Sequence, residues 1–167
     1  FEPFTLPNEL VVPAGNYNND GAALNARSSR TRPYGAELTL EVQDFFGGES
    51  ETIELELLAR PSRFLDLKAN YSREDISVPA GEVTVEVGSL DAVVNLSPRL
   101  SISTQTQYDN LSESLSFFGR MRWELRPQTE LFLSFAHGAL IEGSDFGRNF
   151  RSIQSRSVIR LGNTLRF

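Results

Sequence analysis

The 167 residues are enough for one domain, or for a piece of a larger protein. With no cysteine and one histidine, the chain excludes a disulfide framework, a thiolate metal site and a multi-histidine metal centre, and its net charge of −6 argues against nucleic acid as the main partner. No stretch approaches the roughly 20 apolar residues of a membrane-spanning helix, whereas 40% hydrophobic residues suit a β-barrel as well as a soluble β protein.

The chain begins with a proline-containing segment and continues as alternating strands. Residues 1–15 show little alternation and predict a loop or the end of an upstream region. If the protein is exported, its signal lies upstream or has been removed. Residues 16–28 form a weak strand pattern. Beyond them, apolar side chains recur at every second position, which predicts strands rather than helices. These stretches are 34–43, 52–59, 65–72, 90–96, 100–108, 115–125, 131–135 and 156–167.

The connections between these stretches alternate in kind. One set is short and contains proline, at 30–33, 60–63, 97–99 and 126–128. The other is longer and polar or glycine-rich, at 44–50, 75–82, 109–114 and 138–151. Short turns at one rim and long loops at the other are typical of a transmembrane barrel, whose short turns are periplasmic. The sequence therefore predicts an all-β fold, an up-and-down antiparallel transmembrane β-barrel, of which residues 16–167 supply the C-terminal eight to nine strands.

Charged residues occupy the face of each strand opposite the apolar one. We expect this face to line the lumen, with Glu37, Glu41, Glu54, Glu56, Asp66, Arg120, Arg122, Glu124, Arg156 and Arg160 on it. Charged side chains away from bulk solvent must be paired with opposite charges or hydrated by enclosed water. The acidic and basic groups therefore either meet as salt bridges across a narrow, plugged barrel or line opposite walls of a water-filled pore.

Aromatic residues lie mainly near the strand ends. Tyr34, Trp123 and the terminal Phe167 lie near the short-turn rim, and Tyr71 and Tyr108 lie near the long-loop rim. Two such belts are typical of a barrel that crosses both interfaces of a bilayer. Large aromatics in a soluble sandwich more often fill the middle of the core.

Several stretches carry a family resemblance. They are Val-Pro-Ala-Gly-Asn-Tyr at 12–17, Ser-Arg-Thr-Arg-Pro-Tyr-Gly at 29–35, Asp-Phe-Phe-Gly-Gly at 44–48, Ala-Arg-Pro-Ser at 59–62, Thr-Gln-Tyr-Asp-Asn at 106–110, Arg-Met-Arg-Trp-Glu-Leu-Arg-Pro at 120–127 and the closing Arg-Leu-Gly-Asn-Thr-Leu-Arg-Phe. From about residue 12 onward, the chain resembles the C-terminal barrel domain, of unknown function, in bacterial proteins with an N-terminal family-nine-type carbohydrate-binding domain.

The resemblance implies a bacterial outer-membrane location, with outer-membrane lipid and lipopolysaccharide as surroundings. It also implies an absent N-terminal half, with a glycan or that upstream domain as a further partner. The C-terminal Phe167 resembles the insertion signal of outer-membrane barrels, which implies recognition by the barrel-assembly machinery. The resemblance supplies no catalytic residues.

The number of strands also favours an incomplete barrel. If Phe167 ends in the periplasm, nine spanning strands would start the chain outside the cell, and bacterial barrels have even strand numbers. We expect further strands upstream; the alternative is that residues 16–28 do not span and eight strands close alone.

Three functions fit the sequence. The leading expectation is a non-enzymatic membrane anchor or channel of a larger surface or periplasmic protein, with no cofactor and no metal. The second is a secreted, soluble β-sandwich that binds carbohydrate through Trp123, Tyr108 and Tyr34. The third is an outer-membrane hydrolase that uses His137, with Ser134, Ser144 and Asp145 close to it in the sequence.

Overall fold

The computed structural model describes residues 4–5, 11–12, 14–17, 19–29, 31–142 and 149–163. In this part of the chain, nine strands form one sheet in which each strand pairs antiparallel with the one before it, and two short strands pair separately. The strands are β1 (Phe4–Thr5), β2 (Val11–Val12), β3 (Gly21–Arg27), β4 (Tyr34–Phe45), β5 (Gly48–Ser62), β6 (Leu65–Val78), β7 (Gly81–Ser97), β8 (Leu100–Asp109), β9 (Ser114–Arg126), β10 (Thr129–Glu142) and β11 (Asn149–Asn163).

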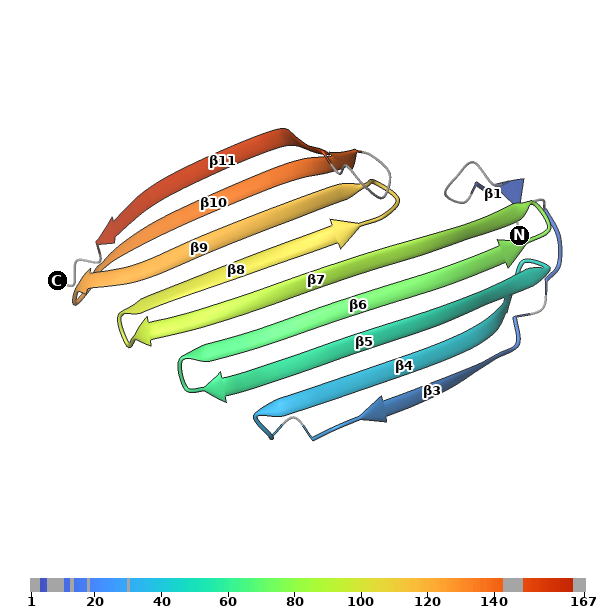
Figure 1. Ribbon diagram of the computed structural model, residues 1–167, viewed down its shortest axis with the longest axis horizontal. Coiled ribbons are helices and arrows are strands. Elements are labelled where there is room, and N and C mark those ends of the chain that lie inside the picture. The colour runs from blue at the N-terminus through green and yellow to red at the C-terminus, as the bar shows by residue number, and fades with distance from the viewer. Residues whose placement is uncertain are drawn as a thin grey trace.

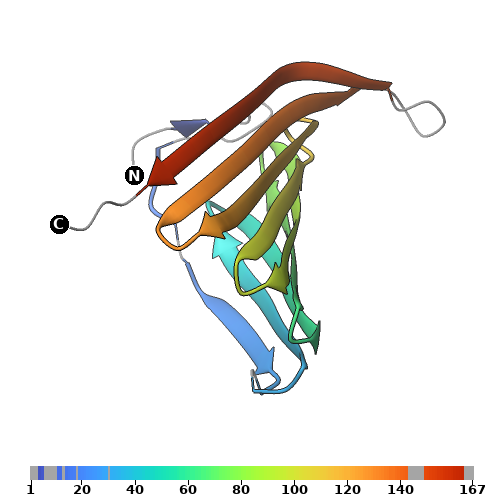
Figure 2. The ribbon, with the colours of Figure 1, turned by 90° about the vertical axis from the view of Figure 1, so that its left-hand side faces the viewer.

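The large sheet is a curved trough rather than a closed tube. Its strands lie in chain order from β3 at one edge to β11 at the other (Figure 1). Seen along the strands, the sheet bends through a wide arc and its two edges stay apart (Figure 2). The all-β, up-and-down antiparallel prediction is confirmed, while closure into a barrel stays a prediction.

Tight turns join most of the strands. Phe45 pairs with Gly48, so Phe46 and Gly47 form a two-residue turn, and their φ angles of 48° and 82° are those of a type I′ hairpin. Pro127 and Gln128 join β9 to β10, where proline followed by a φ of 72° fits a type II turn. These turn types impose the hairpin order that the sheet shows.

Two of the predicted long connections are wrong. Residues 44–50 and 75–82 are mostly strand, because β4 and β5 continue to the turn at Phe46, and β6 and β7 continue to a two-residue turn between Val78 and Gly81. Near the tips the alternation changes phase, because Ile76, Val78 and Val83 lie on the face that carries polar residues further along the strands. The backbone ladder continues, but the pattern of the strand middles does not. The connection at 109–114 is a short turn between paired Asp109 and Ser114, and residues 143–148 lie outside the described part.

The segment before β3 is also more structured than predicted. The expected loop at 1–15 contains the paired strands β1 and β2, and the weak strand predicted at 16–28 is β3. Tyr17 lies edge-on to Phe46, with their ring centroids 5.3 Å apart, at the tip of the β4–β5 hairpin. The segment before β3 therefore contacts the end of the sheet that carries the β4–β5, β6–β7 and β8–β9 turns. We call this end the rim of the longer hairpins.

Few side chains of the described residues are buried. A small cluster of Ile76, Val78 and Val83 packs with Phe45 near the tips of β4 to β7. Ser50 is fully buried beside this cluster on the same face, and its hydroxyl donates to Glu74. Apart from the two-stranded β1–β2 pair, the described part contains no second sheet that could cover a face of the nine-stranded sheet. The fold thus leaves most of its apolar side chains without a protein core.

Candidate functional site

Strand register divides the sheet into two chemically different faces. Directly paired residues share a face, so each row of partners can be followed from strand to strand. One row runs through Glu37, Glu56, Asn70, Ser89, Gln107 and Ser116. The adjacent row runs through Leu38, Leu55, Tyr71, Gly88, Tyr108 and Leu115. We call the first the polar face and the second the apolar face.

The structure places every charged residue that was expected to line a lumen on the polar face. These residues are Glu37, Glu41, Glu54, Glu56, Asp66, Arg120, Arg122, Glu124, Arg156 and Arg160. The polar face also carries serine, threonine, asparagine and glutamine side chains in the middle strands. That this face encloses a lumen stays a prediction.

The apolar face is exposed along its whole width. Its large side chains include Leu24, Tyr34, Leu40, Val42, Ile53, Leu57, Leu90, Leu96, Trp123, Leu125, Phe135, Ile159 and Leu161, all at least 36% exposed. Leu161 reaches 66% and Ile159 reaches 75%, both on the edge strand β11. Soluble monomers rarely expose contiguous apolar patches larger than a few hundred Å². A surface of this kind requires a covering medium or partner.

Tyrosine and tryptophan mark the borders of the apolar face. Tyr71 and Tyr108 flank Gly88 in one row, toward the rim of the longer hairpins. Tyr34 and Trp123 lie at the opposite ends of their strands, next to the short turns. These four residues match their predicted positions along the strands, while Phe167 lies outside the described residues.

The distance between the borders can be estimated from strand geometry. On β4 the apolar face extends from Tyr34 to Val42, which is about 26 Å at about 3.3 Å per residue. Tilting the strand by about 40° reduces the height to about 20 Å, close to the roughly 25 Å apolar band of outer-membrane barrels. The apolar face is therefore tall enough for most of a bilayer core.

A charged network replaces the apolar residues just beyond Tyr71. Arg73 donates two hydrogen bonds to the Asp75 carboxylate, at 2.7 and 3.0 Å, and a third to Glu86 at 3.1 Å. Glu86 also accepts from the Tyr71 hydroxyl, and Asp75 accepts from Thr84 at 2.6 Å. Sequence reasoning missed this network, although Arg73 and Asp75 alternate on one strand face and were the available signal. It gives the apolar face a sharp polar boundary.

Several ion pairs on the polar face join neighbouring strands. Lys68 lies 2.8 Å from Glu56, Arg60 lies 2.9 Å from Asp66, and Arg27 lies 3.7 Å from Glu37. Arg122 pairs with Glu130 on the next strand. The pairs are local, and none of them joins the β3–β6 half of the sheet to the β9–β11 half.

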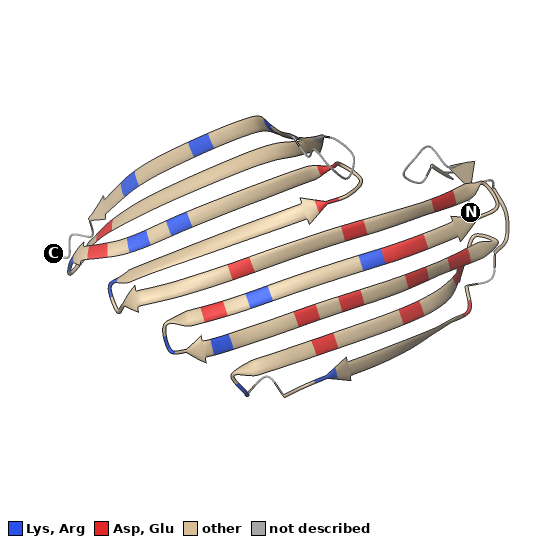
Figure 3. Ribbon diagram, in the orientation of Figure 1, with Lys and Arg blue, Asp and Glu red and all other residues tan. Residues whose placement is uncertain are grey.

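A second set of charges on the polar face has no ionic partner among the described residues. Glu41 and Glu54 belong to β4 and β5, whereas Arg156 and Arg160 belong to β11. Figure 3 shows acidic residues concentrated on β4 to β7 and arginines on β9 and β11. Local pairing therefore leaves acidic charge on one arm of the trough and basic charge on the other.

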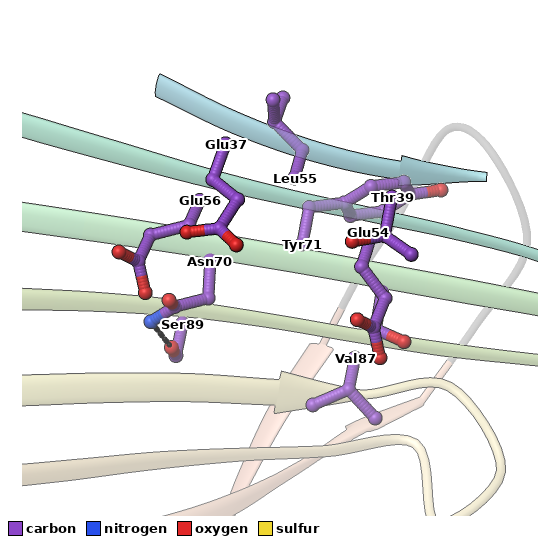
Figure 4. Close-up of a pocket in the computed structure, with 10 residues that line it drawn as sticks. Glu37, Thr39, Glu54, Leu55, Glu56, Asn70, Tyr71, Val87 and Ser89 are labelled. Atoms are coloured by element: carbon purple, nitrogen blue, oxygen red, sulfur yellow. Dashed lines mark hydrogen bonds between the residues drawn. The ribbon is translucent and has the colours of Figure 1, made fainter. Parts of the chain in front are cut away.

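Each arm also contains a hollow. The hollow of the acidic arm, about 380 Å³, is lined by Glu37, Glu54 and Glu56 together with Asn70 and Ser89, which hydrogen-bond to each other at 2.9 Å (Figure 4). The hollow of the basic arm, about 290 Å³, is lined by Arg120 and Arg160 with Phe118, Phe132, Ser134 and Val158. The guanidinium of Arg120 lies 5.1 Å from the centre of the Phe132 ring. The hollows thus differ in charge.

His137 lies on the apolar face and contacts residues other than those considered from the sequence. Its Nδ1 atom lies 2.7 Å from the Ser155 hydroxyl, and its ring stacks on Phe135 with centroids 6.2 Å apart. Ser134, which is close to His137 in the sequence, lies on the opposite, polar face. Ser144 and Asp145 lie outside the described residues.

The described residues contain neither a metal-ligand cluster nor a membrane-spanning helix. No group of three or more histidine, cysteine, aspartate or glutamate side chains is placed to hold a metal ion. No helix in this part of the chain is long and apolar enough to cross a membrane. Comparison with protein-family models, curated proteins and solved structures finds no match.

Proposed function

We propose that this sheet is part of the wall of a β-barrel in the bacterial outer membrane, where it anchors or forms a channel for a larger surface or periplasmic protein. The supporting observation is the continuous, exposed apolar face, which lies opposite a charged face. Leaving apolar surface in water costs about 25 cal/mol per Å². Lipid hydrocarbon against the apolar face removes that surface from water, and water against the polar face keeps its charges hydrated, so no second sheet is needed.

The distribution of charge favours a channel over a plugged anchor. A plugged barrel would neutralise Glu41 and Glu54 with arginines from the opposite wall, but the ion pairs on the polar face of the described residues join neighbouring strands. Charges that remain unpaired must stay hydrated. Water between an acidic and a basic wall keeps both sets hydrated and creates a transverse field that selects among solutes.

A soluble carbohydrate-binding sandwich has less support. It requires a second sheet against the apolar face, and the described residues form one large sheet with only the small β1–β2 pair beside it. Its expected sugar-stacking residues are also dispersed. Tyr34 on β4 and Tyr108 on β8 are four strands apart, about 19 Å at 4.8 Å per strand, which is too far for one platform.

Membrane fractionation of the full-length protein tests the proposal. We expect the protein to resist carbonate extraction from outer membranes, to need detergent for solubility, and to migrate differently on gels before and after heating. A detergent-free, monomeric protein in the soluble fraction would contradict the membrane assignment.

Planar-bilayer recording then separates a channel from an anchor. We expect discrete conductance steps, and we expect the double substitution Arg156→Glu and Arg160→Glu to shift the selectivity of those steps toward cations. The matched control Ile159→Val lies between them on the apolar face and should leave selectivity unchanged. A membrane-inserted protein without conductance would identify an anchor.

A further inference from the structure

The two edge strands run in the same direction. Each strand of the sheet is antiparallel to the next, so the first and the last of nine strands are parallel. Both β3 and β11 run from the rim of the longer hairpins toward the short-turn rim. Direct closure between them would therefore require a parallel pair in an otherwise antiparallel sheet.

The free edge of β3 presents unpaired backbone groups. Ser28 donates its N–H to the Ala36 carbonyl, and Asp44 donates its N–H to the Asp20 carbonyl. Because bonding positions alternate along an antiparallel strand, the backbone groups of Ala23 and Asn25 point away from β4. An unpaired N–H or C=O in hydrocarbon is strongly unfavourable, and spanning sheets therefore have no open edges.

A second copy of this sheet does not satisfy those edges. If the proposed membrane location holds, all copies insert with the same rim outward. The β3 and β11 strands of every copy then point the same way, so pairing between the edges of two copies would again be parallel. Antiparallel completion needs strands that run in the opposite direction.

We infer that an odd number of further strands, supplied by polypeptide N-terminal to Phe1, closes the sheet between β3 and β11. The last of these strands runs toward the rim of the longer hairpins and pairs with β3. This inference rests on the proposed function.

The path of the chain before β3 supports this arrangement. The β1 strand lies at the rim of the longer hairpins (Figure 1). The Tyr17 ring contacts Phe46 at the same rim, and the bond from Asp44 to Asp20 fixes the entry to β3. A preceding strand that reaches this rim would already run antiparallel to β3.

Proline substitution in the full-length protein tests the pairing of β3. Ala23→Pro removes an outward N–H that β4 does not use, so it is tolerated if β3 is an edge strand and disruptive if another strand pairs there. We expect the heat-modifiable, closed form to decrease about 100-fold relative to wild type. The control Ala23→Ser keeps the N–H and should behave as wild type. A heat-modifiable Ala23→Pro protein at wild-type level would overturn the inference.

Disulfide trapping provides an independent measurement that does not depend on folding of the proline variant. Ala23→Cys is combined in turn with Arg156→Cys, Val158→Cys and Arg160→Cys, all on the polar face, in a cysteine-free full-length protein. We expect no disulfide, because intervening strands hold the Cα atoms more than about 7 Å apart. A bond within one chain would indicate direct parallel closure, and a bond between chains would indicate completion by a second copy; either overturns the inference.

Carbonate extraction of the same variants distinguishes a failure of the strand completion from a failure of the proposed membrane location. Membrane-retained protein that forms either disulfide contradicts only the strand completion. Protein that is extracted as a soluble species contradicts the membrane function itself.

Discussion

Replacing an apolar-face leucine with arginine tests what covers that face. Leu57 lies near the middle of the apolar run on β5, pairs with Ala36 and Ala69, and is 45% exposed. Its neighbour Leu58 points to the polar face and pairs with Lys68. Leu57→Arg and Leu58→Arg are therefore the same substitution at adjacent positions with opposite surroundings.

The two variants should differ by a measurable free energy. Arginine at the lipid-facing midplane of a barrel costs about 2–4 kcal/mol, a decrease of about 30-fold to several hundred-fold in the folded ratio. On the polar face the new cation is hydrated, and repulsion from Lys68 contributes at most about 1 kcal/mol. Lys68 is also paired with Glu56 at 2.8 Å, which reduces that repulsion.

Equilibrium urea unfolding from phospholipid vesicles measures the difference, with the fluorescence of Trp123 as the signal. We expect Leu57→Arg to be destabilised by at least about 2 kcal/mol relative to Leu58→Arg. If water covered the apolar face, Leu57→Arg would change stability by no more than about 0.5 kcal/mol. Equal stabilities would therefore refute the reasoning.

Three further predictions concern other parts of the sheet. Gly48→Ala should destabilise the protein by about 1–3 kcal/mol, because its new Cβ would lie 1.8 Å from the Ser77 carbonyl oxygen, whereas Gly88→Ala meets nothing within 4 Å; comparable unfolding midpoints for the two would contradict the close approach of β5 and β6. A double-mutant cycle of Arg73→Ala and Glu86→Ala should give a coupling of about 0.5–1 kcal/mol that falls with added salt, since both side chains are partly exposed; zero coupling at low salt would argue against the network. The wild-type protein and His137→Ala should both leave vesicle phospholipids intact when released fatty acid is measured, because the described part of the chain places no orienting acid on the His137–Ser155 pair; release by wild type and not by the variant would establish a hydrolase.

The two faces of the strands were predictable because side chains alternate with a period of two. Glu54 and Leu55 each fall on the expected side, and so do Arg120 and Met121 at the other end of the sheet. Register did not have to be known, because the alternation already separates the two sets within each strand. The direction of successive strands followed from the proline-marked turns.

The rims were harder to predict for a physical reason. Beyond Tyr71 the alternation changes phase, because Ile76 and Val83 lie on the polar face while Arg73 lies on the apolar face. The pattern of the strand middles therefore no longer follows the ladder that continues to Val78. Side-chain partners could not be predicted either, because the contact of His137 with Ser155 depends on the pairing between β10 and β11. Sequence periodicity locates faces, whereas contacts require the register of separate strands.

Depth-resolved quenching is the most direct measurement of the central claim, that lipid covers one face and water the other. The chain has no cysteine, so single fluorescent labels can be placed at Leu90→Cys and Ile102→Cys on the apolar face and at Ser103→Cys and Gln105→Cys on the polar face. In vesicles, we predict strong quenching of the first pair by spin-labelled phospholipid tails, and quenching of the second pair by aqueous iodide instead. Iodide quenching of all four labels, with no effect of the spin-labelled tails, would contradict the account.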